Sequence, residues 1–90
     1  MKYALVILEY PNETGHQVEG AWVNATITAK DRTTKSGKVV PLNAGCFLCD
    51  LGNGLLDLNI VVGVAASYGI QTRTLFFENE PAFVITKKSS

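Results

Sequence analysis

The sequence has few of the residues from which catalytic and metal sites are built. Its 90 residues include one histidine and two cysteines. Structural zinc sites usually take four cysteine or histidine ligands, so Cys46, Cys49 and His16 supply too few of them. His16 has acidic neighbours in the sequence but no nucleophile of recognisable context. We therefore predict no catalytic residue, no bound metal and no cofactor.

The chain also lacks an excess of charge of either sign. Eight basic and eight acidic side chains cancel at pH 7, so no overall field would concentrate the protein on nucleic acid or on an anionic membrane. Basic residues do gather in one polar segment, as Lys30, Arg32, Lys35 and Lys38. A basic hairpin can follow phosphates, but polar turns are commonly rich in lysine for solubility. We favour a solvated turn over a nucleic-acid site.

No apolar stretch is long enough to cross a bilayer. The longest, residues 55–67, is interrupted by Asp57 and falls short of the roughly twenty residues that a transmembrane helix needs. The apolar run near the amino terminus ends at Glu9 without a small-residue cleavage site, which argues against a signal peptide. We therefore expect a cytoplasmic protein with no membrane partner and with both cysteines reduced.

Apolar residues make up 47% of the chain, which is enough for one core and too little for two domains. The apolar run at residues 2–10 predicts a central strand covered on both sides. Residues 21–29 alternate between apolar and mostly hydroxylated positions and predict a strand with one wet face. Further strands are expected at residues 39–42, where Pro41 favours a sheet edge or a strand end, and at residues 44–51, 72–79 and 82–86, the last two as a hairpin.

One helix is predicted to begin near Gly54. Leu56, Ile60 and Val64 recur at four-residue spacing, and Gly69 stands where a left-handed C-terminal cap belongs. The β-branched residues of this segment leave a strand over residues 59–64 as an alternative. The predicted fold is thus a single α+β domain spanning residues 1–90, with a mostly antiparallel sheet of about five strands and one helix packed on one face.

Cys46 and Cys49 have the spacing of a redox dithiol. Such a pair works at a helix N-terminus, whereas the predicted helix starts several residues later. In a strand, residues three apart point to opposite faces and cannot close a disulfide. We therefore interpret both cysteines as packing residues, since free cysteine is among the most buried residue types.

The segments "MKYALVI" and "AGCFLCDLGNG", followed by a helix, resemble in outline the small partial-RNase-H-like domains of HicB-type antitoxins. The helix of that family is amphipathic and charged, whereas "LNIVVGVAA" is almost uniformly apolar. We therefore assign no family on this resemblance.

The aromatic residues give the main functional prediction. Alternation puts Trp22 on the hydroxylated face of its expected strand, and either Phe76 or Phe77 must point away from the helix. Aromatic residues on an open sheet face resemble the centre of a protein interface. We predict a small non-enzymatic protein-interaction module, such as an inhibitor, an immunity or antitoxin-like protein or an accessory protein, which binds a partner or forms a homodimer. The alternative is a small enzyme or a ligand or metal carrier that uses Cys46, Cys49 and His16.

Overall fold

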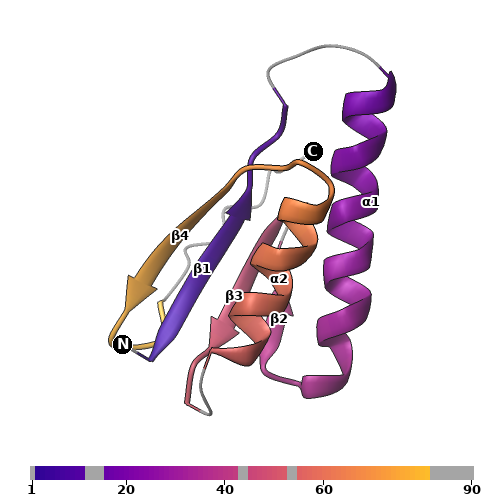
Figure 1. Cartoon of the computed structure of the whole chain (residues 1–90). Coiled ribbons are helices and arrows are strands. Elements are labelled where there is room, and N and C mark those ends of the chain that lie inside the picture. The colour runs from indigo at the N-terminus through magenta and orange to yellow at the C-terminus, as the bar shows by residue number, and fades with distance from the viewer. Residues whose placement is uncertain (1, 12–15, 43–44, 53–54, 82–90) are drawn as a thin grey trace, which may run out of the picture.

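The computed structural model of the chain describes residues 2–11, 16–42, 45–52 and 55–81, and only the backbone of residues 16 and 17. In chain order the elements are β1 (Tyr3–Leu8), α1 (His16–Thr33), the short 3-10 helix η1 (Thr34–Ser36), β2 (Val39–Pro41), β3 (Cys46–Asp50), α2 (Leu56–Ser67) and β4 (Thr72–Phe77). Both long helices lie on one side of the sheet (Figure 1).

The four strands form one antiparallel sheet in the order β2-β3-β1-β4. The predicted α+β class, the antiparallel sheet and the central place of β1 are therefore confirmed. The described residues contain four strands and two long helices, however, where about five strands and one helix were predicted. The strand predicted at residues 82–86 lies outside the described residues. The succession β-α-β-β-α-β is that of the split β-α-β, or ferredoxin-like, arrangement.

The core lies between the sheet and the helices. The side of β1 that faces the helices is buried completely and consists of Ala4, Val6 and Leu8. Cys49 is paired with Ala4 and Phe47 with Val6, so both lie on this side and extend the core across β3. The other side of β1 is only half-buried. The prediction that β1 is covered on both sides is therefore confirmed fully for the helix side and only partly for the other side.

The predicted α2 helix and its cap are confirmed. The helix buries Leu58, Val61, Val64 and Ala65 against the sheet and α1. Gly69 has a φ of 73°, a left-handed conformation that a glycine adopts without the strain of a Cβ. Its N–H donates to Ala66 O at 3.0 Å and the N–H of Ile70 donates to Ala65 O at 2.8 Å. These two bonds form a Schellman cap, and the buried Ile70 makes the apolar contact that accompanies it.

The strand predicted at residues 21–29 is wrong, because this segment lies inside α1. The buried residues of α1 are Ala25, Ala29 and Thr33, which recur every four residues and form one helical stripe. Their small side chains let α1 approach α2 closely. The hydroxyl of Thr33 donates to Ala29 O at 2.7 Å, so its burial leaves no donor unpaired. A helix therefore stands where one arm of a basic hairpin was expected.

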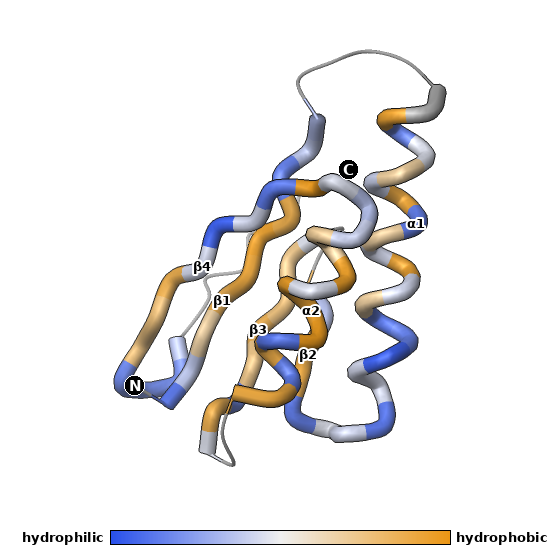
Figure 2. The backbone as a smooth tube through the Cα atoms, in the orientation of Figure 1, coloured by the Kyte–Doolittle hydropathy of each residue, from blue (hydrophilic) through white to orange (hydrophobic). Residues whose placement is uncertain are grey.

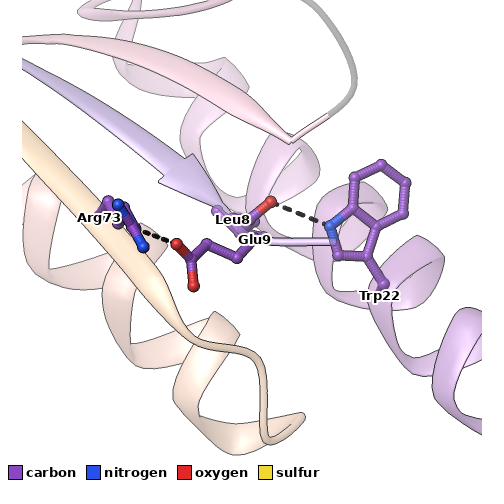
Figure 3. Close-up of polar contacts among 4 residues, drawn as sticks. All are labelled: Leu8, Glu9, Trp22 and Arg73. Carbon is purple, nitrogen blue, oxygen red and sulfur yellow. Dashed lines mark hydrogen bonds and ion pairs between the residues drawn. The ribbon is translucent and has the colours of Figure 1, made fainter. Parts of the chain in front are cut away.

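Trp22 fixes the start of α1 to the end of β1. Its indole Nε1–H donates to Leu8 O at 3.0 Å (Figure 3), and its ring meets Tyr10 edge to face, with centroids 5.0 Å apart. A Cβ on Gly45 would lie 2.9 Å from the indole, and the φ of this residue is 81°. Trp22 is therefore an anchor within the chain, and the prediction that it lies on a sheet face is wrong.

Among the described residues no helix combines the length and the hydropathy that a membrane crossing requires.

Candidate protein-binding surface

The side of the sheet opposite the helices carries an apolar row across all four strands. The register pairs Val40 with Leu48, Leu48 with Leu5, and Leu5 with Leu75. Leu48 near the centre of the row is only 6% exposed, whereas the two ends, Val40 and Leu75, are 51% and 53% exposed. The accessible apolar surface of this side is therefore concentrated at the two edges of the sheet.

One row of β4 backbone groups points to the outer edge of the sheet. Glu9 N–H donates to Gln71 O at 2.9 Å, and facing residues of an antiparallel pair alternate between bonded and non-bonded positions. The odd-numbered residues of β4 therefore bond to β1, and the N–H and C=O of Thr72, Thr74 and Phe76 point to the outer edge. Among the residues that the structure describes, no strand pairs with this edge.

The side chains of β4 are apolar toward its end. Leu75 and Phe76 are 53% and 46% exposed and lie on opposite sides of the sheet. Figure 2 shows that the half of β4 beside the start of β1 is hydrophobic, whereas the other half is polar. In the polar half, Arg73 forms an ion pair with Glu9 (Figure 3). The strand thus combines open backbone groups with exposed apolar side chains, the combination that invites another strand.

The opposite edge of the sheet, at β2, is shorter and partly blocked. Asp50 N–H donates to Lys38 O at 2.8 Å and Leu42 N–H donates to Cys46 O at 3.0 Å. By the same alternation, Val39 and Pro41 point their backbone groups outward. Pro41 has no N–H, so Val39 is the one outward donor of β2. Proline is found on edge strands in this orientation, and its predicted edge position is confirmed.

The three predicted interface residues do not form one surface. Trp22 lies on α1 next to Leu8 and Tyr10. Phe76 is paired with Ala4 on the helix side of the sheet, and Phe77 is paired with Tyr3 on the other side. The two phenylalanines do share β4, which keeps them in the candidate surface. Leu75 and Thr74 were not predicted; the signal that could have found them is "TRTLFF", a strand sequence without proline or lysine.

The two cysteines lie on opposite faces of β3, as their spacing predicts. Cys46 is paired with Ile7 on the side of the sheet opposite the helices and is half-buried, whereas Cys49 is buried in the core. Burial, with a smaller contribution from the charge of Asp57, raises the pKa of the Cys49 thiol to about 11. A thiol with so high a pKa is a poor nucleophile and a poor metal ligand at neutral pH.

The described residues do not form a metal site that would support the alternative function of an enzyme or carrier. Within residues 2–11, 16–42, 45–52 and 55–81 no three His, Cys, Asp or Glu residues are grouped closely enough to hold a metal ion. Only the backbone of His16 is described, so its predicted role stays untested.

Three of the four basic residues lie at two different places, and the fourth, Lys30, is exposed on α1. Arg32 and Lys35 line an open groove between α1 and α2, together with Asp31 and Asn59. Lys38 instead borders a hollow on the side of the sheet opposite the helices, next to Leu48 and Glu80. The segment is thus the end of a helix and a 3-10 turn, not the predicted hairpin, and acidic neighbours accompany its cations in both places.

No family model matches the chain, and neither a curated protein nor a solved structure matches it.

Proposed function

We propose that the chain is a small non-enzymatic protein-interaction module that binds an extended segment of a partner protein along the outer edge of β4. The observation that carries this proposal is the orientation of the β4 backbone, in which Thr72, Thr74 and Phe76 direct their N–H and C=O groups away from β1. An added strand gains affinity from main-chain hydrogen bonds, and side-chain contacts give it specificity.

The side chains of β4 suit such an added strand. Leu75 and Phe77 lie on one side of the sheet and Phe76 on the other, so both sides of the added strand would meet an apolar residue. Aromatic and aliphatic cross-strand pairs each stabilise a sheet by roughly 0.2–1 kcal/mol. The fold alone does not indicate a function, since one fold serves many functions.

The test replaces Thr74, whose N–H points outward, with proline. Thr74→Pro removes one donor of the edge and leaves the bonds to β1 in place. Val40→Lys is the control on the other edge of the sheet, where Val40 is 51% exposed. We expect the wild type and Val40→Lys to capture the same proteins from the native lysate. We expect Thr74→Pro to capture none of them. Capture that is the same with all three proteins would refute it.

The second candidate function, an enzyme or carrier that uses Cys46, Cys49 and His16, is tested by thiol labelling. The raised pKa of Cys49 and its burial predict that it is labelled only after unfolding. Its native pKa of about 11 exceeds the roughly 8.5 of an unfolded cysteine. The contribution of this thiol to stability is therefore present below about pH 8.5 and is lost as the pH rises toward 11. Rapid labelling of Cys49 at pH 7, or a stoichiometric metal, would favour the enzyme or carrier.

A further inference from the structure

We infer that the strand added to β4 is the β4 of a second copy of this chain, bound antiparallel about a two-fold axis at Leu75. The two sheets of four strands then become one continuous sheet with all the helices on one side. This inference rests on the proposed function, because it names the partner of the same edge. It would also give the predicted homodimer a physical basis that does not involve Trp22.

The backbone of β4 is complementary to itself. Two identical edges can pair antiparallel only if outward-pointing residues of one copy face outward-pointing residues of the other. On β4 the outward residues are the even-numbered ones. The two-fold axis must therefore pass through one residue position, and the registers that keep most of the strand paired are centred on Arg73, Thr74 or Leu75.

The side chains select among these three registers. An axis at Arg73 would place two guanidinium groups directly opposite each other, which is unfavourable. An axis at Thr74 would place Leu75 opposite Arg73 and Phe76 opposite Thr72, so both exposed apolar residues would face polar ones, whereas an axis at Leu75 leaves only Phe76 of these two facing a polar residue. An axis at Leu75 places Leu75 opposite its own copy and Phe77 opposite Arg73, where the cation can contact the ring.

The same register also uses Phe76. It faces Thr74 of the other copy, and these two residues exchange both of their backbone hydrogen bonds. The two-fold axis repeats this pair, so four hydrogen bonds surround the Leu75 contact. Both apolar residues that β4 exposes, Leu75 and Phe76, are then covered.

Residues 78–81, the described part of the chain after β4, do not follow the outer edge of this strand. Glu80 borders a hollow together with Tyr3, Lys38 and Leu48. Tyr3 and Leu48 belong to the side of the sheet opposite the helices, so the described chain after β4 turns toward that side and toward β2. It does not turn back along the outer edge of β4 before Pro81, the last described residue.

The decisive experiment is disulfide trapping combined with sedimentation equilibrium of the full chain. Facing residues at a non-bonded position have Cα atoms about 4.5 Å apart, which suits a disulfide. In a Cys46→Ser background, Leu75→Cys is expected to form a covalent dimer under mild oxidation. Arg73→Cys is the matched control, since its two copies would lie about 13 Å apart, four residues along the strand, and should stay unlinked.

Sedimentation provides the second measurement. The wild type is expected to show a monomer–dimer equilibrium, and Thr74→Pro to raise the dimer dissociation constant roughly a hundredfold, because it removes two of the four central hydrogen bonds. A wild type that is monomeric at every concentration overturns the inference. So does trapping through Arg73→Cys but not through Leu75→Cys. If the wild type is monomeric but captures lysate proteins in a way that depends on Thr74, the inference of a second copy is wrong and the proposed function stands. If the wild type neither dimerises nor captures proteins through Thr74, the proposed function is wrong too.

Discussion

The two edge strands of the sheet, β2 and β4, differ in how much of their outward backbone can accept another strand. Both β2 and β4 have one row of backbone groups without a partner strand in the described residues. Strand β2 limits this row to three residues and places Pro41 in it, which removes a donor, whereas the six residues of β4 have neither a proline nor a lysine. Sheet edges that are left open in this way are the natural sites of strand addition. This difference is the reason why the proposed interaction is placed on β4 and not on β2.

The largest effect is expected from placing a proline at one of two neighbouring positions of β4. Leu75→Pro removes the N–H that bonds to Leu5, and Thr74→Pro removes one that points outward. We expect Leu75→Pro to lower the free energy of unfolding by about 3 kcal/mol, and Thr74→Pro by about 1 kcal/mol. Urea unfolding measures both. Equal losses would mean that the outward residues of β4 have been assigned incorrectly.

A second substitution separates folding from association at a predicted interface residue. Trp22→Ala removes the hydrogen bond to Leu8 O and the contact with Tyr10. We expect a loss of about 2–3 kcal/mol in the free energy of unfolding. The dimer dissociation constant of the folded fraction should stay the same, because Trp22 is not one of the residues that pair in the proposed dimer. A weaker dimer with unchanged stability would return Trp22 to the interface.

The sequence predicted the elements whose signals are local. Gly69 marked the end of α2, and Pro41 marked an edge strand, since each residue has a backbone preference that context rarely overrides. Residues 21–29 misled because Thr26 and Ile27 favour strands, and alternation imitates a half-exposed strand. The helical signal was the stripe of Ala25 and Ala29, whose small side chains carry little hydrophobic contrast. Packing of this stripe against α2 decides the structure.

The candidate surface was only half predictable for a different reason. The alternation of Phe76 and Phe77 on a strand follows from the sequence, and it placed them on opposite faces correctly. Which strand forms an edge depends on the order β2-β3-β1-β4, in which β1 pairs with two strands that are distant in the chain. No local pattern encodes that order, so the open backbone of Thr74 could not be foreseen.

The third test compares the two ends of the apolar row. Leu75 and Val40 lie on the same side of the sheet and are 53% and 51% exposed. We expect Leu75→Lys to weaken association roughly tenfold or more through loss of the apolar contact and repulsion across the two-fold axis. Val40→Lys should leave it unchanged. Light scattering over a concentration series checks both, and equal effects would assign the interaction to the sheet side opposite the helices instead of the β4 edge.

The smallest effect is expected from opening the protected edge. Pro41→Thr restores the outward N–H that β2 lacks, on a residue whose side chain is exposed, so the fold should lose less than about 1 kcal/mol. The β2 edge then has two outward donors, but it is still only three residues long, against six in β4. We expect a small increase in species larger than a dimer in sedimentation velocity at high concentration, because each molecule now has two edges that can pair. Combining Pro41→Thr with Thr74→Pro should leave only weak association through β2. If the double variant associates as strongly as the wild type, strand length and proline placement are not what distinguishes the two edges.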